Sequence, residues 1–328
     1  MPASPARQGG RARPGKQERR AGEALILDLR RKVIFGTKNR PLLNMLLNPL
    51  TFHTPETLSE TLDLYANLQN ARLKAGGTFL LNSLKLLKRK GTKTPDHIIS
   101  LRKVAELQGI SADEEKLTIQ AMTTISEIFD SPLLTDNFTV LRTVCRNIST
   151  QPIRNMATLG GNLTCRYTWT EMPAVMIGLE AHLHFLGTNG QKEIIPAEEF
   201  FKNAAKTNKI LSHVTIARDK RARIAYRRVK KTQFVDIPLL SLLIKTYIEN
   251  GRFTRSVAAV NNCVDFAQRD YILEGFLKDK PCHPGIVQEA LEHLDTKIYE
   301  KRSDDYKRHM FRLSIKSVIG EIVENGNT

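Results

Sequence analysis

The sequence predicts a protein that mixes α-helices with β-strands and contains more than one domain. Its 328 residues suffice for two or three domains of ordinary size, and a hydrophobic content of 41% suffices for real cores. Segments with helical periodicity alternate with short strand-like segments along the chain. Near residue 218 the composition of the chain changes, because many basic residues follow within a strand-like segment. This change predicts a domain boundary.

The first 46 residues are predicted to be a basic, largely disordered extension. About half of the net charge of +16 lies in residues 1–40, which hold eleven Lys and Arg against three acidic residues. Residues 1–22 contain hardly an aliphatic side chain, so they cannot bury enough apolar surface to become ordered. Arg19 and Arg20 resemble a twin-arginine export signal, but the short, acidic segment that follows disfavours export.

Membrane, metal and nucleic-acid functions are disfavoured by the pattern of residues. The longest apolar candidate, residues 42–50, is far shorter than the ~18–20 residues that a membrane span requires. The four cysteines are dispersed without a CxxC pair, which favours reduced thiols in the cytoplasm over a zinc or iron–sulfur site. The basic stretch 218–231 is nearly free of aromatic residues, so a solvated or subunit-contacting surface is favoured over a nucleic-acid groove.

The individual elements follow from periodicity and capping signals. Before residue 218 the sequence predicts a helix with Thr54 as its N-cap, a strand over 71–75, a helix from Leu80, strands over 97–101 and 116–121, and a helix over 124–129. After it come an apolar segment over 237–248, a turn at Asn250 and Gly251, a strand over 256–260, and helices over 271–277, 284–299 and 304–322. His182 and His184 alternate along a strand, where a solvated face is favoured over a metal site.

Two glycine pairs about eighty residues apart are the most specific feature of the chain. Gly76 and Gly77 lie between a predicted strand and a predicted helix, whereas Gly160 and Gly161 belong to a string over 151–162 that also supplies a cation, three amides and a hydroxyl. Glycine has no Cβ, so the backbone can come close to an anion, and consecutive N–H groups can point at it. Each pair alone could be a structural turn, but together they could grip one diphosphate.

Three segments in this order, 73–78, 119–124 and 153–162, resemble the flavin-binding medium subunit of molybdenum hydroxylases, the group of xanthine dehydrogenase and carbon monoxide dehydrogenase. Residues 304–310 are also similar to the last helix of that subunit. The resemblance covers nearly everything after residue 47. It implies an α+β fold with a two-lobed FAD-binding domain of the vanillyl-alcohol-oxidase/PCMH type over residues 47–218, split near residue 104, and a small α+β C-terminal domain over 219–328.

The same resemblance implies FAD as the cofactor, bound between the two lobes. It implies no catalytic acid, base, nucleophile or metal ligand, because the cofactor carries the chemistry and the protein binds and orients it. The residues that the resemblance places against FAD are Leu73, Lys74, Ala75, Gly76, Gly77, Thr78, Phe79, Leu80, Ile153, Thr158, Gly160, Gly161, Asn162, Glu171, Leu211 and Arg227.

The implied function is that of an oxidoreductase subunit. Electrons would come from iron–sulfur clusters in a small partner subunit, supplied by a large subunit with the molybdenum cofactor, and would leave through FAD to NAD⁺ or another acceptor. Phe79 stands where the family commonly has an acidic or amide residue, and the bulky stretch 165–169 stands where it has small ones. These departures motivate an alternative: a flavin-free scaffold, or a nucleic-acid-associated homologue of the same fold. A third hypothesis, a free-standing flavin reductase like the enolpyruvyl-glucosamine reductase of cell-wall synthesis, fits the last hundred residues less well.

Overall fold

The computed structural model describes residues 49–203, 208–230, 232, 237–262, 264–300 and 304–325. The predicted basic extension, residues 1–46, lies outside this part of the chain. Two compact units are distinguished, one of Met1–Asn48 with Ser83–Thr94 and one of Pro49–Asn82 with Pro95–Thr328. The described part of the first unit is most of helix α3 (Leu80–Arg89) and the turn after it. All the sheets belong to the second unit.

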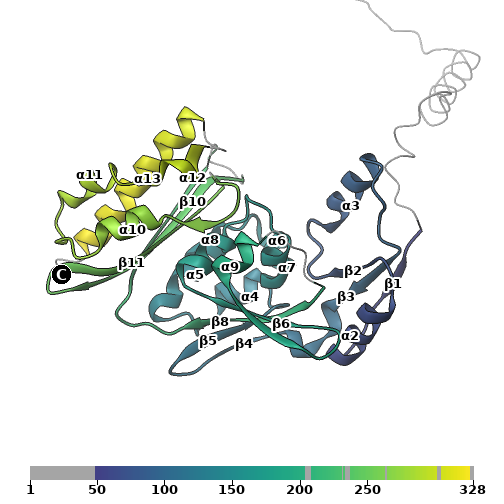
Figure 1. Ribbon diagram of the computed structural model, residues 1–328. Coiled ribbons are helices and arrows are strands. Elements are labelled where there is room, and N and C mark those ends of the chain that lie inside the picture. Colours follow the sequence, from purple (N-terminus) through teal and green to yellow (C-terminus); the bar gives the residue numbers. More distant parts are fainter. Residues whose placement is uncertain are drawn as a thin grey trace, which may run out of the picture. The chain divides into compact units, whose positions relative to one another are not determined.

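Three sheets form the framework of that larger unit (Figure 1). A parallel sheet in the order β1-β3-β2 is followed along the chain by an antiparallel sheet in the order β4-β5-β8-β6-β7 and by an antiparallel sheet in the order β12-β11-β10-β9. The strands are β1 (Thr51–His53), β2 (Ala71–Lys74), β3 (His97–Ser100), β4 (Ile110–Ala112), β5 (Lys116–Gln120), β6 (His182–Leu186), β7 (Lys192–Pro196), β8 (Ile210–Ala217), β9 (Arg223–Lys230), β10 (Pro238–Glu249), β11 (Arg252–Asn261) and β12 (Gln268–Arg269).

Helices accompany each sheet, so the α+β class predicted from the sequence is confirmed. They are α2 (Leu58–Asn67), α3, α4 (Ile125–Asp130), α5 (Thr139–Asn147), α6 (Gln151–Arg154), α7 (Leu159–Thr164), α8 (Met172–Gly178), α9 (Ala197–Lys202), α10 (Tyr271–Leu277), α11 (Ile286–Ala290), α12 (Thr296–Glu300) and α13 (Asp305–Glu324). Among the described helices, none combines the length and the apolar character that crossing a membrane requires.

Two of the predicted helices differ from the structure. The first begins at Leu58 with Thr57 as its N-cap, because the Thr57 hydroxyl accepts the N–H of Glu60 three residues later; the prediction of Thr54 as the cap was wrong. The predicted helix over 284–299 is broken into α11 and α12. Between them the Asp295 N–H donates to the Asp270 carboxylate at 3.1 Å, which satisfies that N–H outside a helix.

The five-stranded sheet buries one face and leaves the other polar. On the buried face, side chains such as Leu117 and Phe185 join residues of α4, α5, α7, α8 and α9 in the largest core of the protein. The alternation of buried and part-exposed residues along β5 and β6 is the pattern of an antiparallel sheet with a single covered face. On the polar face the imidazoles of His184 and His213 stack with their centroids 4.1 Å apart.

This histidine pair is expected to make the protein less stable in mild acid. Burial, together with the neighbouring His213, His182 and Lys116, lowers the pKa of His184 from 6.5 to about 4. Between these values the unfolded chain binds more protons than the folded one, so the stability that is present above pH 6.5 falls as the pH is lowered through this window. Urea unfolding at several pH values checks this, and His184→Gln should reduce the slope. Equal slopes for variant and wild type would contradict it.

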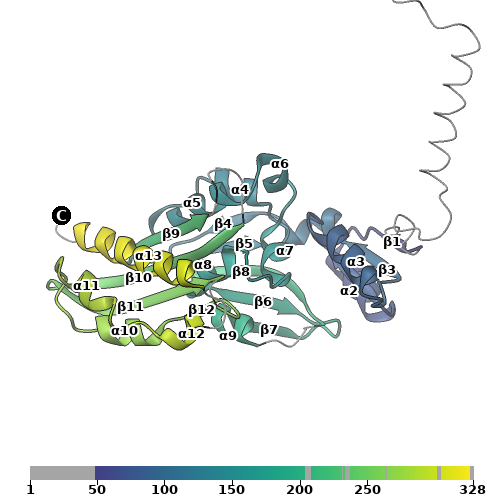
Figure 2. The ribbon, with the colours of Figure 1, turned by 90° about the horizontal axis from the view of Figure 1, so that it is seen from above.

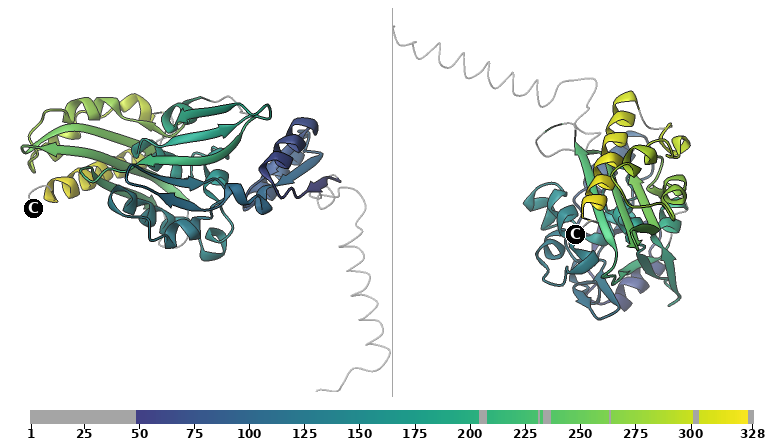
Figure 3. Two further views of the ribbon diagram at one scale, coloured as in Figure 1. Left: turned by 90° about the horizontal axis from the view of Figure 1, so that it is seen from below. Right: turned by 90° about the vertical axis from the view of Figure 1, so that its left-hand side faces the viewer.

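The four-stranded sheet is covered on both faces. In Figures 1 and 2 the long helix α13 lies beside β9 and β10, and its apolar residues share a core with β10, β11 and the helices α10 to α12. Figure 3 shows α13 against these strands from two further sides. Leu243, on the opposite face of β10 from Leu242, packs in the core of the five-stranded sheet. Because both faces of the sheet are covered, β10 is an almost continuous apolar run, which is the apolar segment noted in the sequence over 237–248.

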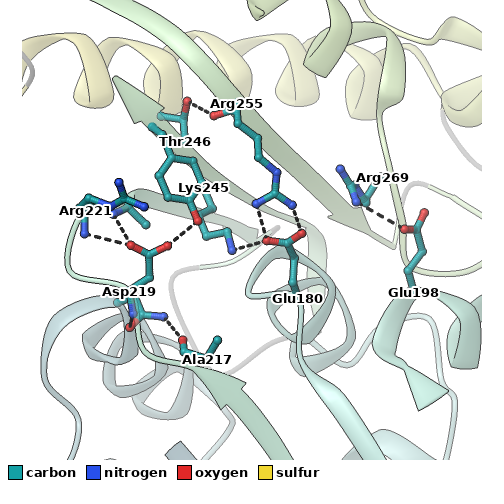
Figure 4. A network of polar contacts seen from close by, with 12 residues as sticks. Glu180, Glu198, Ala217, Asp219, Arg221, Lys245, Thr246, Arg255 and Arg269 are labelled. Atoms are coloured by element: carbon teal, nitrogen blue, oxygen red, sulfur yellow. Dashed lines mark hydrogen bonds and ion pairs between the residues drawn. The ribbon is translucent and has the colours of Figure 1, made fainter. Parts of the chain in front are cut away.

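Two acidic residues that precede the four-stranded sheet in the chain, Glu180 and Asp219, contact side chains of that sheet (Figure 4). The Glu180 carboxylate, just after α8, accepts hydrogen bonds from Lys245 of β10 and from Arg255 of β11. The Lys245 side chain is only 5% exposed, so this ion pair compensates a nearly buried charge. Asp219 accepts a bond from the hydroxyl of Tyr247 in the same region. These contacts fix how the five-stranded and four-stranded sheets meet.

Candidate functional site

The two glycine pairs predicted to act together lie against each other. We call residues 76–79 glycine loop 1 and residues 156–162 glycine loop 2. A Cβ built on Gly76 would lie 1.8 Å from the backbone oxygen of Met156, and one built on Gly161 would lie 3.2 Å from the Cβ of Ala75. Real Cβ atoms do not approach a backbone oxygen so closely, so only glycine at position 76 permits this contact.

Glycine loop 1 presents backbone N–H groups that have no acceptor among the described residues. The N–H groups of its four residues, Gly76 to Phe79, donate none of the hydrogen bonds found among the described residues. Gly77 has a φ of +75°, and the Leu80 N–H closes the loop by donating to the Gly77 carbonyl oxygen at 3.2 Å. Consecutive free N–H groups around a left-handed residue are the arrangement that binds anions in backbone nests.

Lys74 adds a cation to this loop. Its Nζ lies 3.5 Å from the position that a Cβ of Gly77 would occupy. Within the described part of the chain no carboxylate pairs with it, and its other neighbour is the ring of Phe52, whose centroid is 6.0 Å away. Glycine loop 1 therefore combines a lysine and four N–H donors, which is the chemistry of a phosphate site.

Glycine loop 2 differs from the prediction, because its N–H groups already have acceptors. The Leu159 N–H donates to the carbonyl oxygen of Thr123 at 3.0 Å, and the Gly160 N–H donates to that of Ala121 at 2.8 Å. The Gly161 N–H donates to the Thr158 hydroxyl, which caps helix α7. The expectation that both glycine pairs offer free N–H groups is thus correct for loop 1 and wrong for loop 2.

The glycines of loop 2 serve close packing instead. A Cβ on Gly160 would lie 2.8 Å from both the Cβ and the carbonyl oxygen of Ala121, and the neighbouring residue Thr158 is buried. Ala121 belongs to the segment over 119–124 that the sequence singled out as one of three family-like pieces. That segment fixes glycine loop 2 in place.

One polar atom of glycine loop 2 is buried without a partner. Asn162 Oδ1 is shielded from solvent and has no hydrogen-bond partner in the structure. A buried amide oxygen in this state costs free energy unless a ligand or water donates to it. The Arg154 guanidinium donates to Gln151 Oε1 at 2.6 Å and, at 3.4–3.5 Å, to the carbonyl oxygens of Arg146, Ile148 and Ser149 around the end of helix α5, while its Nε is also buried without a partner.

The other residues predicted as FAD contacts have varied environments. Leu73 and Ala75 pack on a small core at the three-stranded sheet, and Ile153 packs on the core of the five-stranded sheet. Leu211 of β8 is 5% exposed and belongs to that same large core. Arg227 of β9 forms an ion pair of 3.1 Å with Glu321 of α13. The roles of these residues toward a cofactor stay predictions.

Glu171 has partners inside the protein. Its side chain is 3% exposed, accepts the hydroxyl of Tyr226 at 2.9 Å and pairs with the Nε of Arg228. Burial raises the pKa of Glu171, although Arg228 and Tyr226 favour its charged form. Sequence reasoning gave this residue a place near a flavin and did not foresee a buried ion pair between the start of α8 and β9.

Three aromatic residues next to the loops were noted in the sequence only as departures from the family pattern. The structure brings them together. The ring of Phe79, the last residue of glycine loop 1, contacts those of Tyr167 and Trp169 edge-on, at centroid distances of 4.6 Å and 5.7 Å, and Tyr167 stacks on Trp169 at 4.1 Å. We call these three residues the aromatic trio. Nothing in the local sequence pattern signalled that they would meet.

These observations fit a diphosphate-containing cofactor. The N–H donors and Lys74 suit its negative charge, the glycine contact brings two loops to one place, and Asn162 Oδ1 offers an unused acceptor. Within the described residues, no group of three or more His, Cys, Asp and Glu side chains is arranged to hold a metal ion.

Comparison with known proteins places this site in a family. Residues 48–218 match the family described as the FAD binding domain in molybdopterin dehydrogenase. The carbon monoxide dehydrogenase medium chain of Hydrogenophaga pseudoflava is 31% identical over 151 residues, which are 46% of this chain and 51% of that one, so this match spans about half of the relative's length. The putative xanthine dehydrogenase FAD-binding subunit of Escherichia coli is 22% identical over 284 residues, 83% of this chain and 96% of that one.

Solved structures agree in fold. A carbon monoxide dehydrogenase structure from Hydrogenophaga pseudoflava superposes with a TM-score of 0.75 at 25% identity, covering 84% of this chain and 97% of that one. Quinoline 2-oxidoreductase from Pseudomonas putida 86 superposes with a TM-score of 0.73 at 24% identity, covering 86% and 98% of the two chains. Because the family match takes in more than half of the sequence, including both glycine loops, this chain belongs to the family of FAD binding domains in molybdopterin dehydrogenases.

Proposed function

We propose that this chain is the FAD-carrying electron-transfer subunit of a molybdenum hydroxylase complex. An iron–sulfur subunit would deliver electrons taken from a substrate at a molybdenum-cofactor subunit, and NAD⁺ or another acceptor would receive them. The family match and the names of the relatives support this proposal.

The observation that carries the proposal is that four N–H groups of glycine loop 1, beside Lys74, have no acceptor among the residues that the structure describes. In this proposal these groups bind the diphosphate of FAD. Glycine loop 2 sets the close approach, and Asn162 Oδ1 accepts a hydrogen bond from the cofactor. Residues 47–218 form the FAD-binding domain, with lobes that divide near residue 104, and residues 219–328 form the C-terminal domain. Leu73, Ala75, Leu80, Ile153, Glu171, Leu211 and Arg227 are the further candidate contacts.

Bound FAD supplies the capacity to take up and release electrons singly or in pairs. The chain itself is left with binding and positioning. The lysine and the N–H groups would balance the negative charge of the phosphates. The packing of Gly160 on Ala121 and of Gly76 on Met156 keeps the two loops in register.

The first test is the flavin content of the purified chain. We expect an absorbance spectrum typical of flavin and near-stoichiometric FAD, identified by chromatography after denaturation. A chain that is colourless and fails to take up added FAD would contradict the proposal and favour the flavin-free scaffold. If FAD is present, anaerobic reduction followed by mixing with NAD⁺ separates the acceptors, because only a NAD⁺-linked subunit should be reoxidised by it.

A further inference from the structure

The aromatic trio joins glycine loop 1 to the segment that follows helix α7. Phe79 ends the loop, while Tyr167 and Trp169 lie beyond the Cys165 cap of α7. The Phe79 ring contacts Tyr167 at an interplanar angle of 71° and Trp169 at 63°, which is the edge-to-face geometry that aromatic rings prefer. Phe79 is 40% exposed, and the aromatic contacts of its ring among the described residues are those with Tyr167 and Trp169.

The segment that carries Tyr167 and Trp169 is anchored to the body of the protein. Arg166 has a φ of +53°, which turns the chain out of α7. Its guanidinium donates to the carbonyl oxygens of Phe200 and Asn203 at the end of α9 and lies over the Phe200 ring at 4.4 Å. Both the N–H and the hydroxyl of Thr170 donate to the Tyr167 carbonyl oxygen. The two stacked rings therefore form a fixed platform.

Glycine loop 1, in contrast, is restrained by few hydrogen bonds of its own backbone. In the part of the chain that the structure describes, its four N–H groups have no acceptor, and Gly77 adopts a backbone conformation that other residues rarely enter. Two of its contacts with distant parts of the described chain are the contact of Gly76 with Met156 and that of the Phe79 ring with Tyr167. A loop with these features samples open conformations readily unless side chains restrain it.

We propose that the aromatic trio is a clasp that keeps glycine loop 1 in its anion-binding conformation and thereby sets the rate at which FAD is released. Phe79 is the moving half and the Tyr167–Trp169 stack the fixed half. This inference rests on the proposed function for the identity of the ligand, but closure of the loop is a property of the flavin-free chain. Phe79 acts as a positioning residue, through the backbone of the loop.

Two measurements on the full-length chain test the clasp. In the flavin-free protein, trypsin cleavage after Lys74, followed by mass spectrometry, reports how often the loop opens. In the loaded protein, the release of FAD on dilution gives a dissociation rate, and the only tryptophan, Trp169, reports the state of the trio by its fluorescence. Phe79→Ala should raise both rates by about ten-fold, which is the effect expected of two lost aromatic contacts.

Controls separate the clasp from general damage. Phe79→Tyr keeps the ring and should restore both rates to values close to wild type. Tyr306→Ala removes a ring that is 53% exposed at the start of α13 and should change neither. If Phe79→Ala matches wild type in cleavage, or speeds cleavage without speeding FAD release, the clasp is overturned. A wild-type chain that binds no FAD would instead contradict the proposed function, and cleavage after Lys74 would still decide whether the trio closes the loop.

Discussion

Replacing Gly76 with alanine is expected to weaken FAD binding by about 10- to 100-fold, because overpacking of this kind costs roughly 1–3 kcal/mol. The new Cβ would lie 1.8 Å from the oxygen and 2.7 Å from the carbon of the Met156 carbonyl, and 3.1 Å from the Cα of Ala157. All three are backbone atoms, so no side chain can rotate away and the two glycine loops must separate. Titration of the flavin-free variant with FAD, followed by flavin fluorescence, measures the loss.

Two matched glycine variants show whether the effect is steric and local. Gly275→Ala introduces a Cβ with no atom within 4 Å, and should bind FAD as the wild type does. Gly77→Ala meets mainly the flexible end of Lys74 but must adopt a φ of +75°, so it reports backbone strain in loop 1 rather than contact between the loops. Unchanged FAD affinity in Gly76→Ala, with an unchanged melting temperature, would mean that the loops do not meet as described.

Local sequence rules were sufficient to predict glycine loop 1. A strand, a glycine pair and a leucine-rich helix follow each other within twenty residues, and each is recognisable from its own pattern. The strands predicted over 97–101 and 116–121 and the helix predicted over 271–277 are likewise found as β3, β5 and α10, whereas the cap at Thr57 and the break in the helix over 284–299 were not predicted. In that second case the deciding contact is the Asp270 carboxylate, which lies 25 residues away along the chain and is buried by the fold.

The N–H groups of glycine loop 2 could not be predicted in the same way. Their acceptors, the carbonyl oxygens of Ala121 and Thr123, come from a turn more than thirty residues earlier, and only the tertiary structure shows that they are occupied. A glycine pair has the same appearance in sequence whether it donates to a phosphate or permits close packing. The aromatic trio could not be predicted for the same reason. Phe79 and Trp169 are ninety residues apart in the sequence, and their rings meet only because the tertiary structure brings the two glycine loops together.

Replacing Glu171 with glutamine is expected to lower the free energy of unfolding by about 3–5 kcal/mol, the usual cost of breaking a buried ion pair from one side. The side chains of Glu171 and Arg228 are 3% and 9% exposed, and the Tyr226 hydroxyl donates to the same carboxylate. Glutamine keeps the size of the side chain but removes the charge that faces a nearly buried guanidinium. Urea unfolding of the flavin-free chain measures the change.

This experiment also separates the two roles that sequence and structure suggest for Glu171. If its main role is the ion pair with Arg228, the flavin-free variant loses stability, and adding Arg228→Gln should recover part of the loss because the nearly buried guanidinium is then removed as well. Glu56→Gln, which alters the exposed pair with Lys103, is the control in which little change is expected. If Glu171 acts chiefly on the cofactor, its variant should instead unfold like the wild type without flavin and bind FAD more weakly. Since both carboxylate oxygens already have partners within the chain, we expect the first result.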